Sequence, residues 1–171
     1  MSNVKRMVIS GLFVAVALVL PMAFHAIPNA GRIILPMHIP VLLCGFICGP
    51  LFGLLCGILS PVLSSMLTGM PPMAMLPSMV CELAVYGLVS GFVFNKIKIG
   101  GNLVRIYTSL ITAMLCGRLF YGMLNALIFQ AGKYSFTAWL TAAFTMALPG
   151  IVIQLTLIPI IMLALKKGKL I

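Results

Sequence analysis

The 171-residue chain is 63% hydrophobic and 7% charged, and its formal net charge is +10. Soluble domains carry roughly 25% charged residues, so this composition excludes a soluble protein and predicts an integral membrane protein. A spanning helix needs about 20 residues, which leaves room for about six spans and for no additional soluble domain. The basic residues fall in short segments between apolar stretches, a pattern typical of topology signals rather than of nucleic-acid binding.

Six apolar stretches predict one transmembrane domain, residues 1–171, that is all α-helical. The predicted spans are at about residues 4–23, 33–48, 51–68, 75–94, 106–129 and 136–165. With the N-terminus inside, eight basic residues would face the cytoplasm and two the outside. The eight are Lys5, Arg6, Lys96, Lys98, Arg105, Lys166, Lys167 and Lys169, and the two are Arg32 and Lys133. This asymmetry predicts that both termini are cytoplasmic.

The first span follows Lys5 and Arg6 and resembles a signal peptide. Its apolar run is long and lacks a clean small-x-small exit, so we expect an uncleaved span. Gly11 and Ala15 form a small-x-x-x-small pair that would let another helix approach closely. The pair can serve packing within the chain or docking to a separate membrane protein, and the spacing alone does not separate the two.

Prolines interrupt the second and third spans. Two of them flank His38, so regular helix is not expected at that end of the second span, and His38 is either a pocket residue or an interfacial histidine. Gly49-Pro50 predicts a tight turn before the third span. The segment 69–73, which contains Met70, two prolines and Met73, predicts a loop that is either a lid over a ligand or a plain connector.

The fourth span contains Glu82, the only acidic residue of the chain. A lone carboxylate in an apolar segment is costly and needs a partner, and the fifth span offers Arg118 at a similar depth. Two interpretations stay open here. The two residues can form a structural ion pair, or Arg118 can bind a ligand carboxylate while Glu82 orients it or accepts a hydrogen bond from the ligand.

Uncharged polar groups accompany this pair at helical spacing. Tyr86 lies one turn after Glu82, Tyr121 and Asn125 continue the stripe of Arg118, and Gln154 lies deep in the sixth span. A few convergent polar groups in an apolar surrounding are typical of a small-molecule site.

Catalysis is poorly supported by this sequence. It has one acidic residue, two histidines without metal-ligand spacing, and neither a Gly-x-Ser-x-Gly nor a phosphate-binding loop. The five cysteines all lie in apolar segments, so we expect small buried or lipid-facing residues rather than a metal site or disulfides. They are Cys44, Cys48, Cys56, Cys81 and Cys116. We expect no enzyme, no metal and no cofactor in this chain.

The whole chain resembles the substrate-binding S component of energy-coupling factor (ECF) vitamin transporters. Four blocks carry the resemblance: the basic N-terminus with Gly11-x-x-x-Ala15, the block 35–43 with Gly45 and Gly49-Pro50, the block 67–73, and Glu82-Leu-Ala-Val-Tyr-Gly87. The last two blocks are similar to the pantothenate-type branch.

The resemblance implies a six-helix bundle in the bacterial cytoplasmic membrane that binds one vitamin near its outer face. It implies a transmembrane coupling protein and two cytoplasmic ATPases as partners, with ATP used by those partners, and release of the vitamin by toppling. Gly11 and Ala15 would contact the coupling protein, with glycine in place of the usual first alanine. The resemblance also implies ligand positions, which we select by the chemistry of their side chains as much as by their place in the chain. They are His38, Met70, Met73, Glu82, Tyr86, Arg118, Asn125 and Gln154.

A second function class is an autonomous secondary carrier that works as a homo-oligomer, against which the absence of an internal repeat argues. A membrane-embedded enzyme is a third. Within the first class, one acid, one arginine and neutral groups, among them Tyr121, favour a hydroxylated or amide-bearing carboxylate such as pantothenate. If Glu82 neutralises Arg118, an uncharged, pyridoxine-like vitamin fits better.

Overall fold

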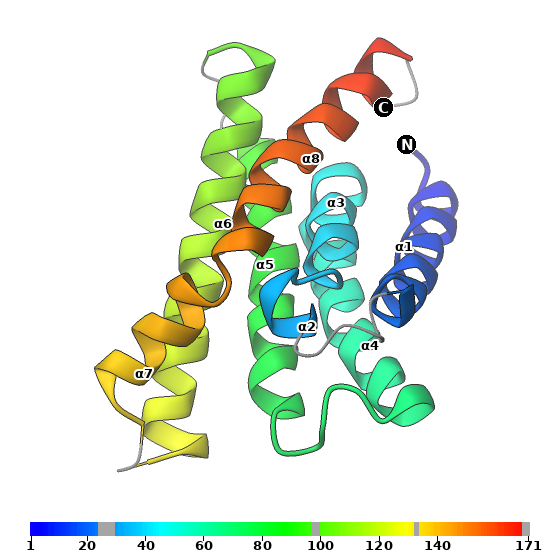
Figure 1. The fold of residues 1–171 in the computed structure, drawn as a ribbon. Coiled ribbons are helices and arrows are strands. Elements are labelled where there is room, and N and C mark those ends of the chain that lie inside the picture. Colours follow the sequence, from blue (N-terminus) through cyan, green and yellow to red (C-terminus); the bar gives the residue numbers. More distant parts are fainter. Residues whose placement is uncertain (24–29, 97–99, 132–133, 169–171) are drawn as a thin grey trace.

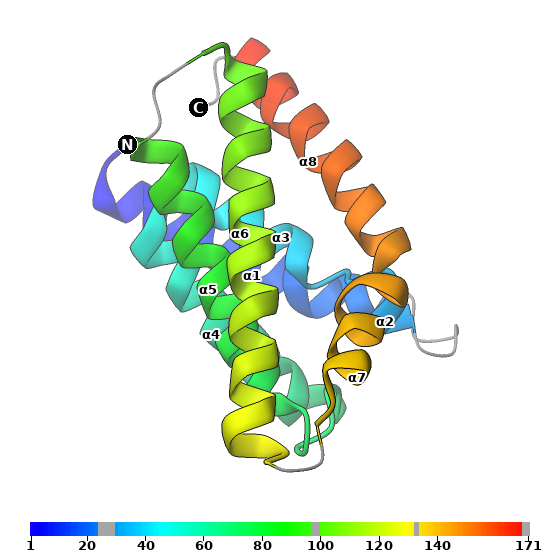
Figure 2. The same ribbon diagram turned by 90° about the vertical axis from the view of Figure 1, so that its left-hand side faces the viewer.

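The computed structural model describes residues 1–23, 30–96, 100–131 and 134–168, and every regular element in these ranges is a helix. In chain order they are α1 (Asn3–Ala23), α2 (Ala30–Ile33), α3 (His38–Cys48), α4 (Pro50–Thr68), α5 (Leu76–Lys96), α6 (Asn102–Leu124), the π-helical η1 (Asn125–Phe129), α7 (Phe136–Leu140), the π-helical η2 (Thr141–Thr145) and α8 (Leu148–Lys167). The helices form one bundle, and the N-terminus and the end of α8 lie at the same end of it (Figures 1 and 2). We call this the terminal end.

Five helical segments of the described residues are long and apolar enough to cross a bilayer. They are α1, α4, α5, the continuous α6 and η1, and α8. The predicted second span, 33–48, differs from these five, since its helix α3 has only 11 residues and rises about 16 Å, against roughly 30 Å for a hydrocarbon core. The prediction of a multi-pass helical membrane protein agrees with this architecture. Six full spans and a cytoplasmic position of the termini stay predictions.

The predicted second span, 33–48, is not one continuous helix. Helix α2 ends at Ile33, and the backbone is irregular until α3 begins at His38. Pro36 cannot donate a backbone hydrogen bond, and Leu35 has a φ of 53°, which no helix tolerates. The expected irregular backbone beside His38 is confirmed, and it places this histidine at the buried start of a half-length helix.

The predicted last span, 136–165, is not one helix. It consists of α7, η2 and α8, with a turn at 146–147. The side chain of Ser135 accepts a hydrogen bond from the Ala138 amide and caps the start of α7. Pro149 lies in the first turn of α8, where a proline fits because no intrahelical donor is needed there. Pro149 therefore lies where a new helix starts.

The two predicted turns around α4 are confirmed. Gly49 has a φ of 98° between Cys48 and Pro50, a conformation open to glycine, so the chain reverses there. Gly69 ends α4 with a φ of 72°. The segment 69–73 is not helical, and it lies at the end of the bundle opposite the termini (Figure 1).

Helices α3, α4 and α5 meet along glycines, which we call the glycine seam (Gly45, Gly53, Gly57, Gly87 and Gly91). A Cβ atom at Gly91 would lie 2.6 Å from both the Gly45 carbonyl oxygen and the Pro50 nitrogen, and one at Gly87 would collide with the Gly53 backbone. The three backbones are therefore in direct contact, which only residues without a side chain permit.

Helix α1 lies on the outside of α3 and α4 (Figure 1). Its Ser10 and Ala17 are buried against the bundle, whereas Gly11 and Ala15 lie on the exposed face. A Cβ atom at Gly11 would meet nothing within 4 Å. In the described residues, Gly11 and Ala15 therefore do not serve helix packing within the chain.

Basic side chains gather at the terminal end. Arg105 donates from Nε to the Phe94 carbonyl oxygen at 2.5 Å, and Lys166 donates from Nζ to Asn102 Oδ1 at 2.6 Å. Four basic side chains used to predict the orientation lie outside the described residues or side chains: Arg32, Lys98, Lys133 and Lys169.

Candidate functional site

Buried polar side chains collect in the half of the bundle away from the terminal end. Glu82 lies in the second turn of α5 and Arg118 near the end of α6, so both face the loop-bearing end (Figure 1). Nine buried side-chain polar atoms of the described residues have no hydrogen-bond partner, and seven of them belong to His38, Tyr86, Arg118 and Gln154. Buried polar groups are normally paired, so this concentration marks a place where a ligand can supply the partners.

Glu82 faces His38 rather than Arg118. The distance from Glu82 Oε1 to His38 Nε2 is 3.9 Å, which is too long for a hydrogen bond. His38 is the first residue of α3, whose start has no side-chain cap, so the positive end of that helix also lies near the carboxylate. No ion pair between Glu82 and Arg118 occurs among the described residues, and the structural pair that the sequence suggested is not formed.

Arg118 is held by the backbone and keeps free donors. Its Nη1 donates to the Ala143 carbonyl oxygen in η2. Its Nε and Nη2 are buried without a partner, and only 4% of the residue is exposed. A guanidinium fixed on one side, with two N–H groups open on the other, is suited to a carboxylate.

Tyr86 lies between the two charged residues. It is fully buried, and its hydroxyl lies near both Glu82 and Arg118 without a hydrogen bond of normal geometry to either. Its ring packs edge-on against His38, with 5.1 Å between the ring centroids. The four side chains therefore form one continuous polar cluster across α3, α5 and α6.

Asn125 and Gln154 are also buried, with exposed fractions of 2% and 0%. Asn125 Nδ2 donates to the Tyr121 carbonyl oxygen at 2.8 Å, so one of its two polar ends is already used within its own helix. Both amide atoms of Gln154 lack a partner. One turn earlier, Gly150 packs on the backbone carbonyls of Ile33 and Ile34, which places this part of α8 against the chain entering α3.

Met70 and Met73 do not belong to the buried cluster. Their exposed fractions are 48% and 72%. Their loop is tied to the end of α4, because Ser64 Oγ donates to the Met70 carbonyl oxygen at 2.7 Å and Ser65 Oγ to the Pro71 carbonyl oxygen at 2.9 Å. A role of the two methionines over a ligand stays a prediction.

Tyr134, in the loop before α7, is a polar residue that the sequence reasoning missed. Its hydroxyl is buried without a partner, and burial, with smaller contributions from nearby Tyr121 and Glu82, raises its pKa to about 12. The phenol therefore stays neutral at physiological pH and can both donate and accept. Its position in a turn, outside any helical period, gave no sequence signal.

The cysteines fall outside this cluster. Cys44, Cys48 and Cys56 are buried between α1, α3 and α4, and the Cys44 thiol contacts the Ser10 hydroxyl at 3.6 Å. No group of His, Cys, Asp and Glu suited to a metal ion occurs in the part of the chain that the structure describes.

The family model described as "ECF transporter, substrate-specific component" matches residues 5–162. The chain belongs to this family. Comparison with curated proteins gave no match. This substrate-specific component is therefore a multi-pass membrane protein, and its family consists of small-molecule-binding subunits of transporters rather than enzymes.

The geometry of this substrate-specific component is suited to binding a small polar molecule. One acid, one arginine and neutral donors and acceptors surround the centre of the cluster, and none of them is arranged as a nucleophile with a base. The cavity of about 430 Å³ that the structure contains at the terminal end has none of these residues in its lining. We take the cluster as the candidate substrate site because most of the unpartnered buried groups are there.

Proposed function

We propose that this substrate-specific component captures a small hydroxylated or amide-bearing carboxylate, with pantothenate as the first candidate. The observation that carries this proposal is the pair of buried, unpartnered donors on Arg118, Nε and Nη2. The ligand carboxylate would accept from these two groups, and the hydroxyl and amide groups of the ligand would reach Tyr86, Glu82 and Gln154.

The charge balance of the site favours an anion over the alternatives. Glu82 faces His38, so it leaves the Arg118 charge without a carboxylate of the protein, which disfavours the uncharged, pyridoxine-like ligand. A cationic vitamin such as thiamine would need more acid or an aromatic cage. His38 and Tyr86 pack edge-on and present no open cage.

A ligand screen tests the substrate class. The purified chain would be heated with pantothenate, with its alcohol analogue pantothenol, with pyridoxine and with thiamine. A bound ligand raises the melting temperature by mass action. We expect the largest shift with pantothenate and a much smaller one with pantothenol. Equal shifts with these two would remove the carboxylate from the proposal.

We further propose that the loaded protein works with a transmembrane coupling protein and two cytoplasmic ATPases, and that it topples in the bilayer to release the ligand inside. The exposed Gly11 and Ala15 on α1 support this proposal, because a flat small-residue surface lets a partner helix approach closely.

Gly11→Leu and Ala15→Leu test this docking surface. Because Gly11 has open space around it, we expect both variants to fold and to bind ligand normally while uptake falls and the coupling protein no longer co-purifies. Uptake by the chain alone in proteoliposomes would instead indicate an autonomous carrier. Equal loss of binding and uptake would mean that the pair serves the fold.

A further inference from the structure

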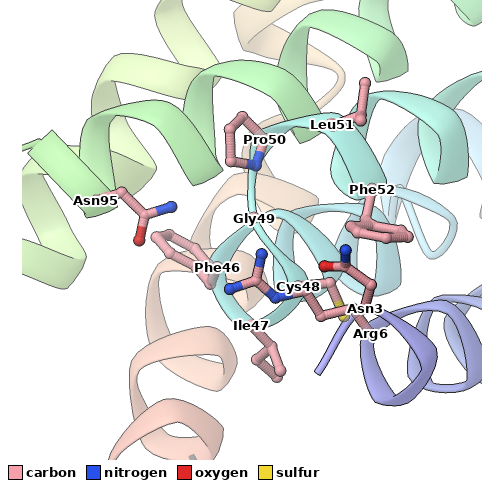
Figure 3. Close-up of a pocket in the computed structure, with 10 residues that line it drawn as sticks. All are labelled: Asn3, Arg6, Phe46, Ile47, Cys48, Gly49, Pro50, Leu51, Phe52 and Asn95. Carbon is pink, nitrogen blue, oxygen red and sulfur yellow. The ribbon is translucent and has the colours of Figure 1, made fainter. Parts of the chain in front are cut away.

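A cavity with polar groups in its lining lies at the terminal end, apart from the candidate substrate cluster. This cavity of about 430 Å³ opens between the start of α1, the α3–α4 turn and the end of α5 (Figure 3). Its polar lining comes from Asn3, Arg6 and Asn95, and its walls are apolar, with Phe46 and Phe52 among them. The volume is within the range of small-ligand sites.

Arg6 is the central polar group of this cavity. Figure 3 shows its guanidinium between α1 and the α3–α4 turn, aimed into the hollow, with the Asn95 amide turned toward the same space. The Nε atom of Arg6 is buried and has no hydrogen-bond partner. A buried guanidinium nitrogen without a partner is costly, and an anion in the cavity would satisfy it.

The surrounding charges also favour an anion. Lys5 and Lys96 are the sequence neighbours of two lining residues, Arg6 on α1 and Asn95 on α5. The only acidic residue, Glu82, lies fourteen positions before Lys96, which is roughly 21 Å away along the helix. Helix α4 begins at Pro50 without a side-chain cap, so the first amide groups of a 19-residue helix add positive potential at the cavity wall. The lining therefore contains the Arg6 cation and the positive end of α4, and none of the lining residues has a carboxylate side chain.

An exposed apolar stripe leads away from the cavity along α4. It consists of Leu51, which lines the cavity, and of Leu55 and Leu59 one and two turns further on. Their exposed fractions are 62%, 45% and 45%. A ligand with a charged head and hydrocarbon chains matches both features at once, and the bilayer around the protein supplies such molecules.

We propose that this cavity binds the phosphate headgroup of an anionic phospholipid, whose acyl chains lie along the Leu51–Leu55–Leu59 stripe. A protein partner docked on Gly11 and Ala15 would not fill it. Arg6 and Ala15 are nine residues apart on one helix, so they point in about opposite directions. The lipid site and the docking face of α1 are therefore separate surfaces.

Lipid titration of the full-length chain in neutral detergent, read by native mass spectrometry, tests this site. The probes are phosphatidylglycerol and phosphatidylcholine with identical acyl chains. One interfacial basic residue contributes about 1 kcal/mol, so we expect a roughly fivefold preference for phosphatidylglycerol in wild type. Arg6→Gln should abolish that preference. The matched control is Lys5→Gln, the neighbouring exposed cation, which should keep the preference within about twofold.

Further measurements separate the lipid from other occupants and from misfolding. Asn95→Asp places a carboxylate at the cavity rim on an exposed residue, and it should also lower the preference while thermal melting stays at the wild-type value. Glycerol 1-phosphate should bind far more weakly than the lipid. Wild-type preference in Arg6→Gln, or equally tight binding of glycerol 1-phosphate, would overturn the lipid assignment. So would loss of coupling-protein capture by Arg6→Gln with the lipid preference unchanged.

Discussion

The two sides of the bundle are built differently. Helices α3, α4 and α5 meet through the glycine seam, where backbone touches backbone and a single added methyl group has no space. The opposite side, α6 to α8, is joined through individual side chains. There, Arg118 donates to the Ala143 carbonyl oxygen, and Trp139 Nε1 donates to the Arg118 carbonyl oxygen at 3.0 Å. The same side contains both π-helical segments, η1 and η2.

This contrast indicates that the two sides have different roles in the proposed substrate site. The close-packed side fixes Glu82 and Tyr86, because α5 cannot shift without breaking the seam. The other side carries Arg118 on α6, which packs closely on α5, and Gln154 on α8, which makes far fewer contacts with the rest of the bundle. π-Helical segments, such as η1 and η2 on this side, are frequent at functional sites. Ligand binding should therefore move α8 more than α3 to α6.

The largest expected effect comes from filling the seam. In Gly87→Val, the new side chain would collide with the Gly53 backbone. We expect this overpacking to lower the free energy of unfolding by more than about 3 kcal/mol. The melting temperature should then fall by at least about 10 °C, or the protein should not fold. Thermal melting and size-exclusion chromatography measure this. Gly11→Val is the control, since that position is open. Wild-type melting of Gly87→Val would mean that the seam is not tight.

Removing the charge of Arg118 should weaken ligand binding far more than it destabilises the fold. Loss of a desolvated charge-assisted contact costs about 2–5 kcal/mol, so Arg118→Gln should weaken a carboxylate ligand by roughly 30-fold or more. The alcohol analogue should bind variant and wild type about equally.

Arg105→Gln is the matched control for this experiment, because it removes an arginine from the same helix at the terminal end. Calorimetric titration of each variant provides the comparison. If folded Arg118→Gln binds the native ligand as tightly as wild type, Arg118 has a structural role and the carboxylate proposal is wrong.

A smaller effect is expected from loosening the join between α6 and α7. Trp139→Phe keeps an aromatic ring and removes the hydrogen bond to the Arg118 carbonyl oxygen, which is worth about 1 kcal/mol, so ligand affinity should fall by roughly fivefold. Phe92→Leu, at an exposed position of α5, is the control. Unchanged affinity with a lowered melting temperature would show that this join serves stability alone.

The smallest expected effect concerns the 69–73 loop on the close-packed side. Ser64→Ala removes the hydrogen bond to Met70, so amide hydrogen exchange in this loop should rise by up to about fivefold, which corresponds to 1 kcal/mol. If the loop closes over the ligand, exchange should fall again on ligand addition. Thr156→Ala, an exposed threonine of α8, controls for hydroxyl loss. A loop that does not respond to saturating ligand is a connector.

Much of this architecture could be predicted because local chemistry decides it. Gly49-Pro50 forces a reversal, and a buried Glu82 or Arg118 signals a polar centre in any apolar span. The contacts between side chains of different helices could not be predicted from the sequence. Glu82 faces His38 because an irregular stretch before α3 brings that histidine to mid-bundle, and Tyr134 enters the site from a turn. Both results depend on tertiary contacts that no periodicity in the sequence encodes.

The glycine seam also has a consequence for how such proteins diverge. Substitution at Gly53 or Gly87 is blocked by main-chain contact, which no neighbouring side-chain change can relieve. Arg118 and Gln154 take no part in the seam. Mutational drift should therefore leave the seam glycines unchanged while the polar positions of α6 and α8 exchange freely. One backbone framework could then acquire new substrates through a few substitutions, without passing through an unfolded ancestor.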